Sequence, residues 1–389
     1  MAEGVDLTHR RRYNVSGLVS IGQAPFQAFT GRSQGAHAQL LDHCLGFFQQ
    51  QWNHSAADSE RRKRIPHRRV TPKAAKIDFP IDAVFTWCDS DDPLWQQQQE
   101  KWAPNPQDAR MKIRFPVPGF TGYELRQSVT LLRTHAPWIR KIFIVVARPQ
   151  SCSWWDAIPN FYAVYHDELW PDPDELPNFN SVAIETVIHR IPGITERFLY
   201  LNDDFYTLRP VEPWMFFTPG GRPIGMARCC QQWHEASRAP TAGAYAGAAL
   251  HLGYPAGILV PAHAPVALTR DLMQQAEDRF GSLIDATRRH RFRSPGDLPP
   301  VLVATNLNAL IWDHRPADPL YEYVDCPTLP AKLARLARDP PTFIVVNNCI
   351  GKEMMTEMTE TLDELIAQLH TISSSAGTSK LSLATGDRT

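Results

Sequence analysis

Two adjacent carboxylates, Asp203 and Asp204, come directly after Asn202 at the end of a short apolar run. That run, residues 197–201, has the composition of a buried strand. Neighbouring carboxylates repel each other, and a bound divalent cation is a common way to offset that repulsion. A solvent-exposed turn is the alternative, because Asn and Asp are both favoured in turns. We therefore take Asp203 and Asp204 as candidate ligands of Mg²⁺ or Mn²⁺.

The elements that would position these carboxylates follow an alternating pattern. Strands are expected at 81–87, 141–147, 161–165, 198–201 and 342–346, and helices at 123–135, 181–190 and 266–284. Strands that alternate with helices predict an α/β fold with a mostly parallel sheet and helices on its faces. In such sheets ligands collect beyond the carboxyl ends of the strands. A second acidic group, Asp89 to Asp92, follows the first strand, so both acidic groups are expected at that edge.

The rest of the chain divides by composition. Residues 1–75 are interpreted as an N-terminal extension that ends near a basic run at 61–69, and residues 76–350 as the catalytic domain. Within the catalytic domain, residues 219–262 are rich in Gly, Ala and Pro and are interpreted as an irregular insertion. Residues 351–389 are expected to form a C-terminal helix with a methionine stripe, followed by a disordered tail. The basic run is more typical of a solvated linker than of a polyanion-binding site.

Composition limits the class of protein. The 389 residues are 43% hydrophobic and 21% charged with a formal net charge of −1, which fits a soluble globular protein and gives no reason to expect nucleic acid as a partner. The seven cysteines lack a disulfide framework, and no secretory leader or membrane span is recognised. We therefore predict a cytoplasmic protein, and a peripheral membrane association stays open.

Common nucleotide and hydrolase motifs are absent: there is no GxGxxG, no Walker lysine loop and no GxSxG. Four separated segments are present instead. The first runs from Ile81 to Pro93. The second is the longest and comprises residues 123–129, 135–145, 176–181, 183–185, 189–192 and 200–204. The third pairs residues 262–265 with 291–293, and the fourth spans 343–348.

In this order the four segments resemble the Stealth family of sugar-phosphate transferases over residues 81–350. That family includes bacterial capsular polysaccharide phosphotransferases and the catalytic region of GlcNAc-1-phosphotransferase. The resemblance implies a Rossmann-like nucleotide-sugar-binding core, a divalent metal, and transfer of a hexose-1-phosphate from a nucleotide sugar, typically UDP-linked, to a sugar hydroxyl. The expected partners are therefore a nucleotide-sugar donor and a carbohydrate acceptor, and the expected process is capsular or extracellular polysaccharide synthesis.

The resemblance also implies roles for individual residues. It places metal and diphosphate chemistry at Asp203 and Asp204, a catalytic histidine at His263 and a phosphate-binding arginine at Arg293. Eight further residues are expected to bind substrate: Thr86, Trp87, Asp89, Arg126, Asn180, Ser181, Glu185 and Asn347. The fourth segment departs from the family pattern, because it reads Asn347-Asn348 where Asn-Asp is usual. An Asn side chain contributes no negative charge to a metal site, although its carbonyl oxygen can still be a ligand.

These residue types suit phosphoryl transfer on chemical grounds. The reaction requires charge neutralisation on phosphate oxygens, which a guanidinium such as Arg293 supplies in a forked geometry. It also requires a base for the acceptor hydroxyl, and His263 is a candidate because histidine has an unperturbed pKa near neutrality. Two alternatives share the same residues. One is a metal-dependent glycosyltransferase that releases a nucleoside diphosphate, and the other is a degenerate, non-catalytic sugar or polyanion binder.

Overall fold

Four of the five strands of the central sheet are apolar runs that the sequence marks as buried strands. The computed structural model describes residues 67–90, 92–103, 122–230, 240–254, 257–312, 321–325, 329–347 and 359–368. Its five-stranded sheet has the order β4-β3-β2-β5-β9, with β9 antiparallel to β5 and the other pairs parallel. The strands are β2 (Ile81–Thr86), β3 (Ile139–Val146), β4 (Phe161–Tyr165), β5 (Arg197–Asn202) and β9 (Val266–Thr269). This arrangement confirms the predicted α/β class and the mostly parallel sheet.

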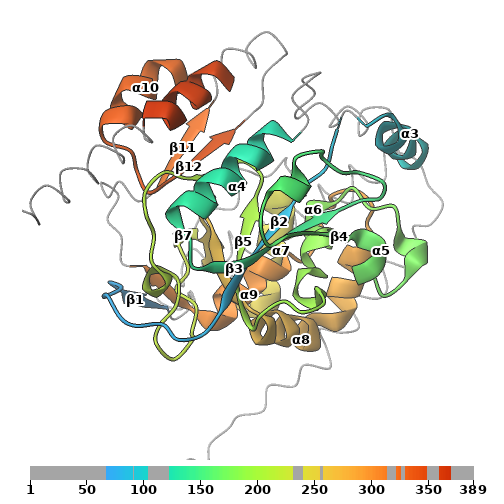
Figure 1. Cartoon of the computed structure of the whole chain (residues 1–389). Coiled ribbons are helices and arrows are strands. Elements are labelled where there is room, and N and C mark those ends of the chain that lie inside the picture. Colours follow the sequence, from blue (N-terminus) through green and yellow to red (C-terminus); the bar gives the residue numbers. More distant parts are fainter. Residues whose placement is uncertain are drawn as a thin grey trace, which may run out of the picture. The chain divides into compact units, whose positions relative to one another are not determined.

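Helices cover both faces of this sheet (Figure 1). On one face, α4 (Tyr123–His135) packs Leu125, Val129 and Leu132 against β2 and β3. On the other face lie α6, α8 and α9, which contribute to a second apolar cluster. The other helices and the 3-10 turns lie around these layers, and the bounds of both sets follow here. The bounds are α3 (Pro93–Trp102), α5 (His166–Leu169), α6 (Ser181–Glu185), α8 (Arg270–Arg289), α9 (Pro300–Asn308), α10 (Leu329–Arg338), η2 (Trp155–Ala157), η3 (Pro173–Glu175), η4 (Ile188–Arg190) and η5 (Pro213–Met215).

A second sheet begins where the acidic pair ends. Its order is β11-β12-β6, formed by β11 (Tyr321–Asp325), β12 (Phe343–Asn347) and β6 (Phe205–Thr207). Strand β12 is antiparallel to β6, and the Val346 amide donates to the Asp204 carbonyl over 3.4 Å. A helix at residues 359–368 packs Leu362 and Leu365 in the same apolar cluster as Tyr206. The chain after Asp204 is therefore fixed to the C-terminal part of the protein.

The interpretation of residues 219–262 as irregular was wrong. The stretch contains β7 (Ala227–Cys230), which pairs with β8 (Ile258–Pro261), and the helix α7 (Pro240–Leu252). Helix α7 is built largely of Ala and Gly and lacks a distinct polar face, so it produces no helical period in the sequence. Buried Ala248 and Ala249 show that this helix packs into a core.

Two further boundaries differ from prediction. The helix expected at 266–284 begins only at Arg270, because Val266–Thr269 forms β9 and pairs with β5. The helix expected at 181–190 is the shorter α6 followed by the 3-10 turn η4. Near the other end of the described chain, β1 (Arg68–Val70) pairs with β10 (Leu310–Trp312), so the end of the predicted extension lies beside residues of the predicted catalytic domain.

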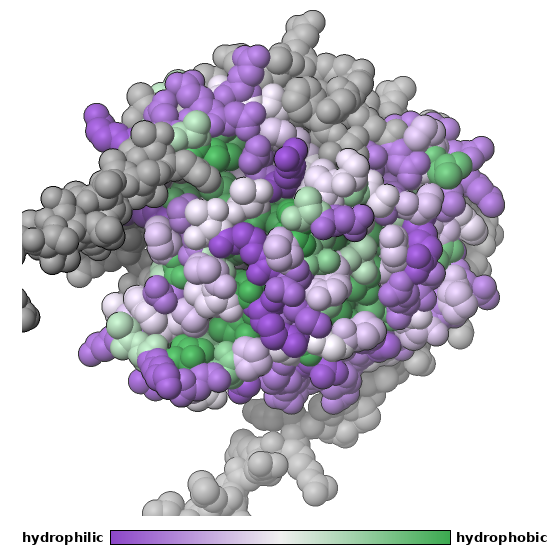
Figure 2. Space-filling view, viewed as in Figure 1, coloured by the Kyte–Doolittle hydropathy of each residue, from purple (hydrophilic) through white to green (hydrophobic). Residues whose placement is uncertain are grey.

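Several predictions fall outside the described residues: most of the N-terminal extension, Asp91, Asn348 and the tail after 368. In the described part of the chain, no helix is both long enough and apolar enough to cross a bilayer. Polar residues cover most of the face drawn in Figure 2, with apolar side chains in smaller areas between them.

Candidate active site at the carboxyl ends of β2 and β5

The acidic turn lies at the carboxyl end of the central sheet. Strand β5 ends at Asn202, and Asn202 pairs in register with Thr86 at the end of β2. Asp203 and Asp204 form the turn that leads into β6. Asp203 is half-buried, whereas Asp204 is only 5% exposed. A nearly buried carboxylate next to a second one is an arrangement that a bound cation would stabilise.

His263 lies beside this turn. It occupies the tight connection between β8 and β9, and it is exposed. Because β9 runs antiparallel to β5, with Val266 opposite Tyr200, the residues before Val266 extend toward the acidic turn. The His263 ring lies 6.1 Å from the ring of Phe205, the residue that follows Asp204. The structure thus brings the predicted histidine and the predicted acidic pair to the same end of β5.

Arg293 and Ser181 are in direct contact, although they are 112 positions apart in the sequence. The guanidinium donates to the Ser181 hydroxyl through Nη2 over 2.7 Å and through Nε over 3.2 Å. Ser181 is the first residue of α6, and Arg293 lies in the loop between α8 and α9. This contact uses two of the five N–H donors of the guanidinium. The other donors can serve a phosphate.

Tyr200 links this pair to the end of β2. Its hydroxyl donates to Glu185 over 3.3 Å and lies 3.2 Å from the hydroxyl of Thr86. Since the tyrosine proton is directed to Glu185, Thr86 acts as the donor in the second contact. Burial raises the pKa of Glu185 to about 7, and the opposing influence of Arg293 and the Tyr200 hydrogen bond only partly offsets that effect. Burial also raises the pKa of Tyr200 well above its ordinary value, so the phenol stays protonated.

Sequence reasoning did not identify Tyr200. Strand alternation could have pointed to it, because Tyr200 lies two positions before Asn202 and side chains two apart share a face of a strand. With Tyr200 included, four predicted residues are joined through contacts or charge: Thr86, Glu185, Arg293 and Ser181.

Three other predicted substrate-binding residues have structural contacts. Asn180 is fully buried; its side-chain oxygen caps α6 at the Val182 amide, and its side-chain nitrogen donates to Asp297. Trp87 is buried in the core with its ring edge-on to Trp155. The backbone of Asp89 exchanges two hydrogen bonds with the side chain of Gln150, at 3.0 and 2.8 Å. These contacts fix the loops that border the site.

The last two candidates are less closely tied to the others. Arg126 is exposed on α4, and within the described part of the chain no side-chain contact joins it to another candidate residue. Asn347 ends β12, one residue after the Val346 amide that donates to Asp204. The backbone therefore places Asn347 next to the acidic turn.

The donor set at the turn fits a cation that shares its ligands with a substrate. Among the residues that the structure describes, no group of three or more His, Cys, Asp or Glu side chains is arranged to hold a metal by itself. Asp203 and Asp204 supply two carboxylates, and Mg²⁺ is commonly held by one or two carboxylates together with substrate phosphates. The described residues at this turn are thus compatible with Mg²⁺ or Mn²⁺ that shares its coordination with a bound diphosphate.

Comparison with known proteins identifies the family. Residues 121–224 match the family model of Stealth protein CR2, conserved region 2, and residues 262–305 match Stealth protein CR3, conserved region 3. The chain carries conserved regions 2 and 3 of the Stealth family. The CR2 match contains Ser181, Glu185 and the acidic turn, and the CR3 match contains His263 and Arg293. The contact between Arg293 and Ser181 therefore joins the two Stealth regions.

Relatives of this chain carry phosphotransferase names. Exopolysaccharide phosphotransferase SCO6021 of Streptomyces coelicolor is 35% identical over 317 residues, which is 77% of this chain and 56% of the relative. Capsular polysaccharide phosphotransferase LcbA of Aeromonas hydrophila is 28% identical, over 63% of this chain and 69% of the relative. The chain spans about half the length of the curated relatives it matches.

Likeness to solved structures is weaker. The galactosyltransferase LgtC, crystallised with donor and acceptor sugar analogs, aligns over 72% of this chain and 95% of its own, with 11% identity and a TM-score of 0.39. We draw no argument from a likeness at that level.

Proposed function

We propose that this chain transfers a hexose-1-phosphate from a nucleotide sugar, UDP-linked, to a sugar hydroxyl and releases a nucleoside monophosphate. The process would be capsular or extracellular polysaccharide synthesis, in the cytoplasm. The names of the Stealth relatives support the substrate class. The observation that carries the proposal is the joint position of two groups of residues at the carboxyl ends of β2 and β5. The acidic turn lies beside His263, and Arg293 lies on Ser181 next to Glu185.

Each of these residues has a task that its position allows. Arg293 binds phosphate oxygens with the N–H donors that Ser181 does not use, and Ser181 fixes the plane of the guanidinium. Arg126, Asn347 and the loop of Thr86 to Asp89 are proposed to line the donor. A Mg²⁺ ion held by Asp203 and Asp204 would supply charge neutralisation on the diphosphate.

Glu185 is suited to a site that holds phosphate. A carboxylate beside a phosphate would repel it, but a pKa of about 7 means that about half of the molecules carry a proton on Glu185 at neutral pH. A protonated carboxyl can donate a hydrogen bond to a phosphate oxygen. Burial of Glu185 therefore lets a carboxyl group stay close to an anionic ligand.

In the proposed reaction one P–O bond forms and another breaks. His263 accepts the proton of the acceptor hydroxyl, and the hydroxyl oxygen bonds to the phosphorus that carries the sugar. The bond between this phosphorus and the oxygen that bridges the two phosphates breaks. The sugar leaves the donor with its phosphate, and uridine monophosphate is released.

The nucleotide product tests this proposal. Incubation of the full chain with a panel of UDP-sugars, a saccharide acceptor and Mg²⁺ is expected to release UMP, and EDTA is expected to stop the release. Asp204→Asn, which keeps the shape of the side chain and removes its charge, is expected to slow release by about 100-fold or more while leaving the thermal melt cooperative. Release of UDP would overturn the proposal in favour of glycosyl transfer, and unimpaired Asp204→Asn would refute the role of the acidic turn.

A further inference from the structure

The loop that carries Arg293 is bound along its length to the segment that carries Ser181. The loop spans residues 290–297 and the other segment residues 174–181. The Phe179 amide donates to the Arg291 carbonyl over 2.9 Å. In the other direction, the Arg291 guanidinium donates to the carbonyls of Asp174 and Leu176 at 2.6 and 3.1 Å. The rings of Phe179 and Phe292 stack with centroids 5.2 Å apart.

Asp297 lies at the centre of this connection. Its carboxylate is buried, with the residue 3% exposed. One oxygen accepts from the Asn180 side-chain nitrogen and from the Ser294 amide, both at 2.9 Å. The other oxygen lies 2.7 Å from Nδ1 of His290. A buried carboxylate is costly unless donors surround it, and three donors meet that requirement here.

The donors come from both segments. Asn180 directly precedes Ser181, and Ser294 directly follows Arg293. One carboxylate therefore fixes the neighbour of Ser181 and the neighbour of Arg293 at the same point. Asn180 in turn caps α6 with its oxygen, so its orientation is determined on both sides.

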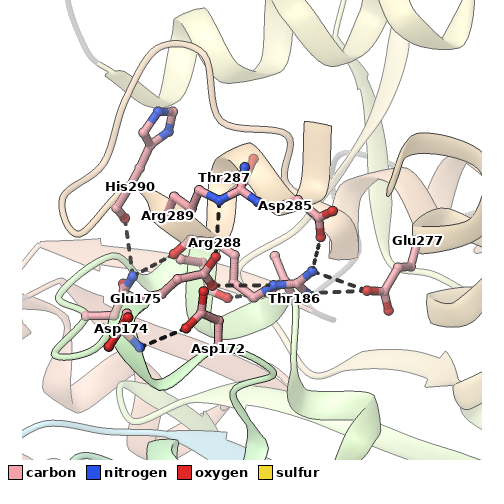
Figure 3. A network of polar contacts seen from close by, with 12 residues as sticks. Asp172, Asp174, Glu175, Thr186, Glu277, Asp285, Thr287, Arg288, Arg289 and His290 are labelled. Carbon is pink, nitrogen blue, oxygen red and sulfur yellow. Dashed lines mark hydrogen bonds and ion pairs between the residues drawn. The ribbon is translucent and has the colours of Figure 1, made fainter. Parts of the chain in front are cut away.

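The start of the loop is anchored separately. Arg288, the next-to-last residue of α8, is buried and lies between the carboxylates of Glu277 and Asp285, with Glu175 also nearby (Figure 3). The Asn178 side chain donates to the Arg288 carbonyl over 3.0 Å. The beginning of the loop is thus held by α8, and Asp297 adds the hydrogen bond that holds the residue directly after Arg293.

We propose that Asp297 is a positioning residue that keeps the Arg293 guanidinium on Ser181 and thereby sets how well Arg293 binds phosphate during transfer. This inference rests on the proposed function, in which Arg293 is the phosphate ligand. The Asp297 carboxylate is occupied by Asn180, Ser294 and His290, so in this proposal it binds neither substrate nor metal. Its effect on the reaction passes through Arg293, which distinguishes it from a residue that supports only the stability of the fold.

A double-mutant cycle separates these two roles. The variants Asp297→Ala, Arg293→Ala and the double variant are compared by kcat/KM for UMP release from UDP-sugars. Asp297→Ala is expected to lower kcat/KM about 10- to 100-fold, mainly in kcat, as misplacement of an electrostatic group does. In the Arg293→Ala background the same change is expected to cost less than about threefold, because no guanidinium remains to be positioned.

Two other substitutions at this position sharpen the test. Asp297→Asn retains an oxygen for Asn180 and Ser294 and can turn its amide nitrogen toward His290, so it is expected to rescue most of the activity lost in Asp297→Ala. Asp297→Glu keeps the charge but moves the carboxylate by one methylene. It is expected to lower kcat only when Arg293 is present, and it replaces Asp297→Ala in the cycle if that variant does not fold.

Asp82 provides the matched control. It is also a buried carboxylate, and it accepts from the amides of Lys141 and Thr195 and from the Arg140 guanidinium near the opposite end of β2. The fold-loss of kcat/KM in Asp82→Asn is expected to multiply with the fold-loss of Arg293→Ala when the two substitutions are combined. If the losses of Asp297→Ala and Arg293→Ala also multiply, the positioning role is overturned.

Amide hydrogen exchange tests whether Asp297 holds the loop, and this test requires no enzyme activity. Asp297→Ala is expected to speed exchange of the Ser294 and Phe179 amides, whereas Arg293→Ala is expected to leave the Phe179 amide protected. Unchanged exchange in Asp297→Ala would overturn the inference. A wild-type protein that releases no UMP would overturn the proposed function instead, and the exchange result would still report whether Asp297 holds the loop.

Discussion

At the scale of single residues, the site depends on groups whose protonation or orientation is set by their neighbours. Glu185 is the clearest case, because burial raises its pKa to about 7 even with Arg293 and Tyr200 favouring the charged form. Tyr200 and Asp297 have no reactive role in the proposed reaction, yet they hold Glu185 and the Arg293 loop. The chemistry proposed for Arg293 and Glu185 therefore relies on two residues that were not among the site residues selected from the sequence.

The raised pKa of Glu185 predicts a pH-dependent stability. The folded protein binds this proton more tightly than the unfolded chain, in which a glutamate has a pKa near 4.5. The resulting stabilisation is fully present below about pH 4.5 and is lost as the pH rises through about 7. Glu185→Gln removes the titration, so the variant is expected to gain about 1–3 kcal/mol relative to wild type between pH 5 and pH 8.

Urea unfolding of both proteins at pH 5, 6, 7 and 8 measures this difference. Free energies of unfolding that change in parallel for wild type and Glu185→Gln would contradict the assignment of a raised pKa to Glu185.

At the scale of elements, α8 connects the sheet to the loop that carries Arg293. Thr269 caps its first turn at the Leu272 amide, and its last turn ends in Arg288 and Arg289 next to Glu175. Glu277 in the middle of α8 contacts His189, Arg190 and Arg288. These contacts, with His189 as the largest influence, lower the pKa of Glu277 to about 2. One carboxylate thus connects α8 to the 3-10 turn η4.

Glu277→Gln is expected to destabilise the protein by about 2–4 kcal/mol at pH 7, because the buried Arg288 loses a charged partner. The stabilisation by Glu277 in wild type is present above about pH 4.5 and is lost as the pH falls toward 2. Asp285→Asn is the control, since Asp285 contacts the same Arg288 but its side chain is 47% exposed. Its cost is expected to stay below about 1 kcal/mol.

Urea unfolding at pH 7 compares the two variants. Equal losses for Glu277→Gln and Asp285→Asn would contradict the view that the buried side of the network carries the stabilisation.

At the scale of the whole molecule, the sequence predicts the sheet well because its strands are continuous apolar runs. Residues 141–147 and 198–201 were recognised in this way and form β3 and β5. The helix α7 was missed because an Ala-rich helix that packs into a core has no polar face to set a period. Residues 266–269 were assigned to a helix because Leu268 continues the apolar spacing of Leu272 and Ala276 in the helix that follows.

The candidate site, too, could be predicted from the sequence only in part. The Asp-Asp pair, His263 and Arg293 could be selected from residue type and family resemblance. Strand alternation could have pointed to Tyr200. Asp297 could not be selected, because its role arises from contacts with residues distant in sequence, such as Asn180, which is 117 positions away. No local pattern encodes such a contact. The turn-forming sequence Ser294-Pro-Gly-Asp297 predicts only a loop.

The central claim is that the bond broken lies between the two phosphates and not between sugar and phosphate. A UDP-sugar labelled at the β-phosphorus tests it most directly, because that phosphorus is the one bonded to the sugar. After incubation with the full chain, Mg²⁺ and a saccharide acceptor, the label is expected in the glycan product as a phosphodiester, with unlabelled UMP released. Label recovered in UDP, with none in the glycan, would contradict the proposed reaction.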